Sequence, residues 1–251
     1  MFGWSQVKKL FIVEFNNQID HSSTKQFYKD MEFVRNKKST AQGVVIRINC
    51  PGGSPSLSYE ISEYIKMFKK DLPVYIYIES MAASGGYFIA AAGDIIYSNP
   101  YAVVGSIGVI LQKIEISGLA DKIGVQEDNV SVGNFKQPVS LFKPIDFESE
   151  DYLKNQLMNP TYNLFVENIS KNRNIPVDIV KSDYADGKVF IASESVGKLV
   201  DELITFHQLT KNLGGEMEFV NTKKKTIKEK LGLTFTLQIP ELQNSTELKL
   251  I

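Results

Sequence analysis

Short runs of apolar residues are separated by amphipathic stretches along the first hundred positions of the chain. Apolar side chains follow one another almost without a break at residues 10–15, 44–49 and 74–78, which predicts three buried strands. Residues 95–98 and 102–110 are further strand candidates. Near-continuous apolar strands are typical of a parallel sheet that is covered on both faces.

Helical spacing occurs between these strands. From Pro55 to Phe68 the apolar residues fall at steps of four, four and three on one helical face, and Ser54 is suited to cap the helix. A second, short apolar helix is predicted from Tyr87 to Ala92. Strands that alternate with helices at this spacing form crossover units, so the fold class predicted is α/β with a parallel sheet and flanking helices.

The pattern changes after about residue 147. Residues 148–172 are amphipathic and helical in pattern, with Pro160 as a predicted break. A mixture of helix and strand follows, and we divide the chain into a domain at 1–213 and an extension at 214–251. Within the extension the strand-like segment 233–239 is a candidate to add to a sheet edge or to a partner's groove; a flexible tail is the alternative.

Composition excludes several classes of function. The 28 Lys and Arg residues are balanced by 29 Asp and Glu, so the chain has no bulk positive field for nucleic acid. One cysteine excludes an internal disulfide framework, and two histidines leave little for a metal site. No apolar run approaches the roughly 18 residues that span a bilayer. The expected location is therefore cytoplasmic, or peripheral at the cytoplasmic membrane.

Two glycine-bearing turns follow neighbouring predicted strands. The first runs from Asn49 to Gly53 and the second from Ser80 to Gly86, and each leads from a strand into a helix. Both therefore lie at the carboxyl edge of the sheet, where open α/β folds place their sites. Each turn alone fits a plain tight turn. Together they can supply one hydroxyl, that of Ser84, and two N–H donors for an oxyanion.

A serine nucleophile needs a base, and the sequence leaves the choice open. The first glycine of the G-x-S-x-G hydrolase elbow is replaced by Ala82, and Ser84 on its own also fits a simple helix cap. His21 lies in a polar stretch and His207 in an amphipathic one, so both fit surface roles better than a Ser-His triad. A desolvated lysine is the remaining base at neutral pH.

Four segments resemble one known family. SMAASGGYFIAAAGDIIYSNPYAVVGSIGV, VVIRINCPGG, GNFKQP and GKVFIASESVGKLVDEL are similar to the signal peptide peptidase A family of serine–lysine peptidases, over residues 10–213. The resemblance implies the ββα spiral of the Clp-protease and crotonase type. It also implies that Ser84 is the nucleophile, that Lys136 is the general base, that Ser106 orients this lysine, and that the N–H groups of Gly53 and Gly85 hold the oxyanion. Neither a cofactor nor a metal is implied.

The same resemblance implies substrates and partners. The substrates are peptides, either remnant signal peptides or unfolded hydrophobic chains. The partner is a second copy in a ring-like homo-oligomer, with eight subunits as a candidate number and the serine and lysine supplied by adjacent copies.

This chain departs from the family pattern at two points. We expect no counterpart of the family's N-terminal membrane anchor, because no apolar run of sufficient length is present, and Cys50 stands where the family usually has serine. Lys143 has neighbours like those of Lys136 and is a rival base. Two other classes stay open: a crotonase-like acyl-CoA enzyme without a nucleophilic serine, and a non-catalytic scaffold on the same fold.

Overall fold

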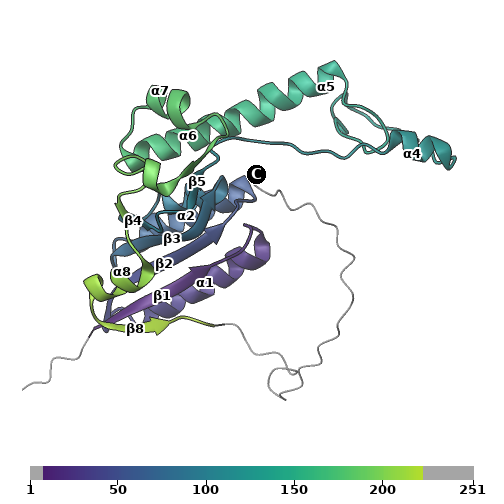
Figure 1. The fold of residues 1–251 in the computed structure, drawn as a ribbon. Coiled ribbons are helices and arrows are strands. Elements are labelled where there is room, and N and C mark those ends of the chain that lie inside the picture. Colours follow the sequence, from purple (N-terminus) through teal and green to yellow (C-terminus); the bar gives the residue numbers. More distant parts are fainter. Residues whose placement is uncertain (1–7, 223–251) are drawn as a thin grey trace, which may run out of the picture. The chain divides into compact units, whose positions relative to one another are not determined.

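The computed structural model describes residues 8–222 (Figure 1). The chain divides into two compact units, Met1–Asn221 and Thr222–Ile251. The second unit lies almost wholly outside the described residues, and with it the strand-like segment 233–239. The fold is therefore that of the first unit.

Eight strands of the described residues form one sheet. Its spatial order is β6-β5-β3-β2-β1-β8, and β4 pairs with both β3 and β7. Every pairing is parallel except that of β5 with β6, which confirms the predicted α/β class with a largely parallel sheet. The strands are β1 Lys9–Phe15, β2 Ala41–Cys50, β3 Val74–Ala83, β4 Ile95–Ser98, β5 Val103–Gly105, β6 Val189–Ile191, β7 Glu202–Leu203 and β8 Glu216–Phe219.

The helices are of several kinds. Two π-helical turns, η1 and η2, and one 3-10 turn, η3, accompany the α-helices. The α-helices are α1 His21–Asn36, α2 Pro55–Phe68, α3 Gly85–Ala90, α4 Ser117–Lys122, α5 Phe147–Tyr152, α6 Asn159–Arg173, α7 Val177–Ile179 and α8 Phe206–Leu213. The other turns are η1 Leu153–Met158, η2 Val180–Tyr184 and η3 Ala192–Glu194.

Alternate strand residues face two different cores. Phe11 and Ile46 belong to the larger core, which also contains the buried apolar side chains of α1, α2, α3 and α6. Leu10 and Val45 point to the opposite face of the sheet, where they pack with Leu209 of α8. Because both faces are covered, the strands are apolar throughout, as their near-continuous hydrophobic pattern predicts.

The strand β3 has two neighbours on one side, and this positions the chain that follows it. Residues 75–78 pair with β4, whereas residues 81–83 pair with β5. The carboxyl end of β3 is thereby held between β2 and β5. The turn after Ala83 consequently lies beside both the turn after β2 and the turn after β5.

Several boundaries differ from those predicted. The helix α1 was not predicted, and the candidate strand at 102–110 ends at Gly105. The sheet continues past residue 213, because β8 pairs with β1 from Lys9 to Ile12.

The predicted break at Pro160 does not occur. The chain stays helical from α5 through η1 into α6, and Pro160 lies in the first turn of α6. The wider π-helical turn ahead of it accommodates the missing N–H and the bulk of the proline ring.

Residues 109–146, which we call the arm, leave the sheet after β5 and return at α5; Figure 1 shows this segment extending away from the strands. Its regular structure is limited to the short helix α4. Many of its large apolar side chains are exposed, including Ile110, Val130 and Val132. Among residues 8–222, no helix is long and apolar enough to cross a membrane.

Candidate active site

Ser84 occupies a sharp turn between β3 and α3. Its backbone φ of +51° is one that residues other than glycine seldom adopt, so the position is strained. Its N–H donates to the carbonyl of Gly105 at 2.8 Å, and its carbonyl accepts the N–H groups of Tyr87 and Phe88. The hydroxyl makes no capping hydrogen bond to α3. The backbone that bears the half-buried side chain is therefore fixed, while the hydroxyl has no hydrogen-bond partner within residues 8–222.

The turn after β2 is shaped by Ile19. The N–H of Ile19 donates to the carbonyl of Gly52 at 2.8 Å, and the N–H of Ser54 donates to the carbonyl of Ile19 at 3.0 Å. This parallel bridge uses the groups on either side of Gly53, so the N–H of Gly53 itself points away from Ile19. A Cβ at Gly53 would lie 2.3 Å from the Ile19 oxygen, and its φ is +147°. Only glycine fits this position.

The two glycine turns are in contact. A Cβ at Gly52 would lie 2.8 Å from the Cβ of Ser84 and 3.0 Å from the nitrogen of Gly85. A Cβ at Gly85 would lie 3.4 Å from the nitrogen of Gly53. Within residues 8–222, neither the N–H of Gly53 nor that of Gly85 has a hydrogen-bond acceptor. Two unused N–H donors beside one hydroxyl form the arrangement that stabilises an oxyanion.

Ser106 is held next to this group. It follows Gly105, whose carbonyl receives the Ser84 N–H, and it donates its own N–H to the carbonyl of Lys188 at 2.7 Å. Its φ of +52° is again in the left-handed region. The strain at Ser84 and Ser106 therefore occurs on two adjacent turns, and such clusters mark functional sites.

Cys50 lies beneath the first turn and is fully buried. The N–H of Gly52 donates to its sulfur at 3.4 Å. Burial raises the pKa of the Cys50 thiol to about 11. The thiol is therefore neutral at physiological pH, and its role is to fill space and to accept the Gly52 N–H.

The helix α3 is anchored from behind. Tyr87 is fully buried and donates its hydroxyl proton to the carbonyl of Leu199 at 2.9 Å. The loop that contains Leu199 is in turn held by Arg173, whose guanidinium binds Asp201 at 2.6 and 3.1 Å and the carbonyl of Lys198 at 3.1 Å. Because Tyr87 follows Ser84 by three residues, these contacts fix the start of the helix.

Lys136 lies apart from these groups. It is exposed on the arm, where its N–H donates to the carbonyl of Gly133 at 3.1 Å. Among the described residues, no hydrogen bond or ion pair joins its amine to Ser84 or Ser106. The rival Lys143 is exposed on the same arm, and its carbonyl accepts the amine of Lys113. The structure therefore brings together every predicted site residue except the lysine.

The remaining candidates have surface positions. His21 is exposed at the start of α1, and His207 is exposed on α8. Neither ring has a hydrogen bond to Ser84 within residues 8–222. Among these residues, no cluster of three or more His, Cys, Asp or Glu side chains is arranged to hold a metal.

Sequence reasoning missed two residues that shape the site. Ile19 sets the Gly52–Gly53 turn through its backbone alone, and no sequence signal marks such a long-range bridge. Ser58 places its hydroxyl 2.4 Å from where a Cβ of Gly85 would lie. The sequence could have indicated this role, because Ser58 lies one helical turn after the cap Ser54. A buried serine at that position faces the neighbouring glycine turn.

Most of the chain is similar to known proteins. The model of "Peptidase family S49" matches residues 66–219, and that of "Clp protease" matches residues 3–116. A putative protease from Methanocaldococcus jannaschii is 29% identical over 85% of this chain and 71% of its own length. A putative signal peptide peptidase SppA from Enterococcus faecium is 34% identical over 70% of this chain and about half (51%) of its own length.

A solved structure has the same fold. It is a membrane-bound stomatin-specific protease with a TM-score of 0.59 and 14% sequence identity, and the match covers 86% of this chain and 99% of the other. A second structure of that protease, in complex with a substrate peptide, has a TM-score of 0.58.

Proposed function

The chain belongs to peptidase family S49, and from this premise we propose that it is a serine endopeptidase with Ser84 as nucleophile and Lys136 as general base. One observation carries the proposal. The hydroxyl of Ser84 is held at a strained strand-to-helix turn beside the unused N–H groups of Gly53 and Gly85. Such a turn exposes a serine oxygen for attack, as it does in other serine hydrolases.

The proposed reaction proceeds through an acyl-enzyme. The neutral amine of Lys136 takes the proton from Ser84, and the Ser84 oxygen attacks the peptide carbonyl. The N–H groups of Gly53 and Gly85 stabilise the oxyanion that forms. Lys136 then gives its proton to the leaving amine, and a water molecule that Lys136 deprotonates releases the acyl group. The Ser106 hydroxyl orients the lysine amine throughout.

We further propose that the lysine comes from a second copy of the chain. Lys136 is exposed on the arm, and within residues 8–222 no hydrogen bond or ion pair joins its amine to Ser84. The same arm leaves large apolar side chains exposed, such as Ile114 at 67%, Val130 at 100% and Val132 at 96%. Apolar surface of this kind is typical of an interface. A ring-like homo-oligomer, with eight copies as a candidate number, would place the arm of one copy against the site of the next.

The proposed substrates are short, extended hydrophobic peptides, such as remnant signal peptides, or unfolded chains. The support is the name of the E. faecium relative, a putative signal peptide peptidase. The proposed chemistry uses neither a cofactor nor a metal.

A fluorophosphonate probe and a peptide-hydrolysis assay test the proposal. We expect the probe to label wild-type protein at Ser84 and Ser84→Ala to lose both labelling and hydrolysis. Lys136→Ala should lose hydrolysis, and so should Lys136→Arg, because arginine keeps the charge but does not act as a base at neutral pH. Full activity of Lys136→Arg would remove Lys136 from the mechanism. Absence of labelling with a pure, assembled protein would favour an acyl-CoA enzyme or a scaffold.

A further inference from the structure

The turn that bears Lys136 is held on both sides. Gly133, with a φ of +101°, starts a turn that Lys136 closes through its N–H. Just before the lysine, the ring of Phe135 stacks on the ring of Tyr152, with centroids 4.5 Å apart and planes at 8°. Just after it, Gln137 and Ser140 both donate hydrogen bonds to Glu127. The lysine thus lies between an aromatic stack and a carboxylate.

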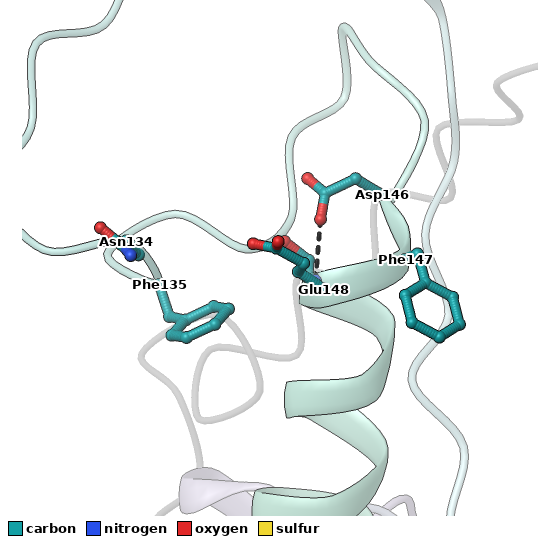
Figure 2. A pocket seen from close by; sticks show the side chains of 6 residues that line it. Asn134, Phe135, Asp146, Phe147 and Glu148 are labelled. Atoms are coloured by element: carbon teal, nitrogen blue, oxygen red, sulfur yellow. Dashed lines mark hydrogen bonds between the residues drawn. The ribbon is translucent and has the colours of Figure 1, made fainter.

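The aromatic side of this arrangement is tied to the protein core. Tyr152 ends α5, which continues without a break through η1 into α6, and α6 buries Phe165 and Ile169 in the main core. Asp146 caps α5 by accepting the N–H of Ser149 at 2.8 Å. Figure 2 shows Phe135 beside the first turn of α5, on the side opposite Phe147. The stack therefore joins the arm to a continuous helix.

On the other side of the lysine, the carboxylate of Glu127 joins residues of the arm that are ten or more positions apart. One oxygen of Glu127 accepts the amide of Gln137 at 3.0 Å, and the other accepts the buried hydroxyl of Ser140. The hydroxyl oxygen of Ser140 also accepts the N–H of Phe142 at 3.0 Å. The hydrogen bond from Ser140 is the largest cause of a lowered pKa of Glu127, so the carboxylate is ionised at neutral pH.

We propose that Phe135, Tyr152 and Glu127 are positioning residues that hold the Lys136 turn in one conformation. The inference rests on the proposed function, because it concerns the lysine assigned there as base. A lysine side chain is long and flexible, so a base on an untethered loop would spend little time in reactive geometry. The stack and the carboxylate fix the backbone on either side of it and so restrict where the amine can reach.

The test compares four variants in the assembled protein. Tyr152→Ala removes the stack and Glu127→Ala removes the carboxylate, whereas Tyr152→Phe keeps the ring and Leu164→Ala changes an exposed apolar residue of α6. We expect Tyr152→Ala and Glu127→Ala to lower kcat by about 10- to 100-fold with little change in KM, since a displaced catalytic group costs up to about 100-fold. Tyr152→Phe and Leu164→Ala should match wild type. Particle size is measured in parallel.

Amide hydrogen exchange of residues 133–140 gives a readout that does not depend on activity. Exchange should become faster in Tyr152→Ala and Glu127→Ala and stay unchanged in Tyr152→Phe. Unchanged exchange and unchanged kcat in both alanine variants, in a protein that Lys136→Ala inactivates, would overturn the inference. If Lys136→Ala itself keeps full activity, the proposed function fails instead.

Discussion

The Ser84 turn and the arm differ in how far contacts within one chain fix their conformation. Around Ser84, the ends of three strands, the bridge to Ile19 and the buried Tyr87 fix each backbone group. The arm is anchored near Lys136 by one ring stack and one carboxylate, and much of its apolar surface is exposed. The proposed nucleophile and its proposed oxyanion donors thus lie together within a chain, whereas the proposed base lies apart from them.

This difference has a chemical consequence. The strained backbone at Ser84 lowers the free energy of unfolding. Within one chain, the packing of the surrounding core offsets this cost. A lysine acts as a base at neutral pH only after desolvation, and an exposed arm does not provide this. Assembly would bury the arm, and it would also bring the amine of Lys136 to the hydroxyl of Ser84. Activity would therefore depend on assembly.

The largest expected effect comes from a glycine of the preformed region. Gly53→Ala places a Cβ 2.3 Å from the Ile19 oxygen and displaces one N–H donor. Losing one oxyanion donor typically lowers kcat by about 10²–10³. The same change at Gly118, in α4, meets no atom within 4 Å in one chain and should lower kcat far less. Steady-state kinetics on both variants, with circular dichroism as a check on folding, make the comparison.

If Gly53→Ala kept wild-type kcat, its N–H would not be an oxyanion donor. If Gly118→Ala lost as much activity, the two regions would not differ as described.

The next effect concerns stability. Tyr87→Phe removes the donor to the buried Leu199 carbonyl, and leaving such a group unpaired costs about 1–3 kcal/mol of unfolding free energy. Tyr152→Phe is the matched substitution at the arm, where the ring stacks on Phe135. It should change the unfolding free energy by less than about 0.5 kcal/mol. Denaturant unfolding measures both. Equal losses in the two variants would contradict the contrast between the regions.

A smaller effect concerns acid stability. Burial alone would raise the pKa of Asp201, but the hydrogen bonds from Arg173 and from the N–H of Ile96 outweigh it and lower this pKa. A lowered folded-state pKa gives stability that is present above the unfolded value of about 3.9 and is lost as the pH falls through the folded value. Wild type should therefore lose stability below about pH 4 more steeply than Asp201→Asn. If the unfolding free energies of wild type and Asp201→Asn fell equally steeply with pH, this account would be contradicted.

The smallest effect is expected at Cys50. Because burial raises its pKa to about 11, the native thiol should resist alkylation by iodoacetamide at pH 8, whereas the unfolded chain should react readily. Mass spectrometry of the treated protein measures the difference. Rapid native modification would show that the turn above Cys50 opens in solution.

Much of the fold could be predicted from the sequence because its pattern is local. Continuous apolar runs marked β1, β2 and β3, and the spacing of four, four and three residues marked α2. The helix α1 was missed although Phe27, Met31 and Val34 have helical spacing, because polar residues dominate the stretch. The strand β8 is short and half-charged, and it is recruited by the edge of β1 rather than by its own pattern.

The site could be predicted only in part. The two glycine turns pointed to Ser84 and two N–H donors as neighbours, and the family resemblance assigned these donors to Gly53 and Gly85. The structure brings the three residues together. Ser84 combines a positive φ with a hydrogen bond to Gly105, and no local pattern in the sequence reveals either feature. The role of Lys136 stays a prediction, because a contact between two copies is not determined by one chain.

Mixing two inactive variants tests the central claim most directly. Ser84→Ala chains keep the lysine and Lys136→Ala chains keep the serine, so a mixed ring contains some interfaces that have both. We predict that co-assembly of equal amounts restores activity to about a quarter of wild type, as random placement around a ring gives. Mixed particles that form and stay inactive would contradict a dyad built between copies.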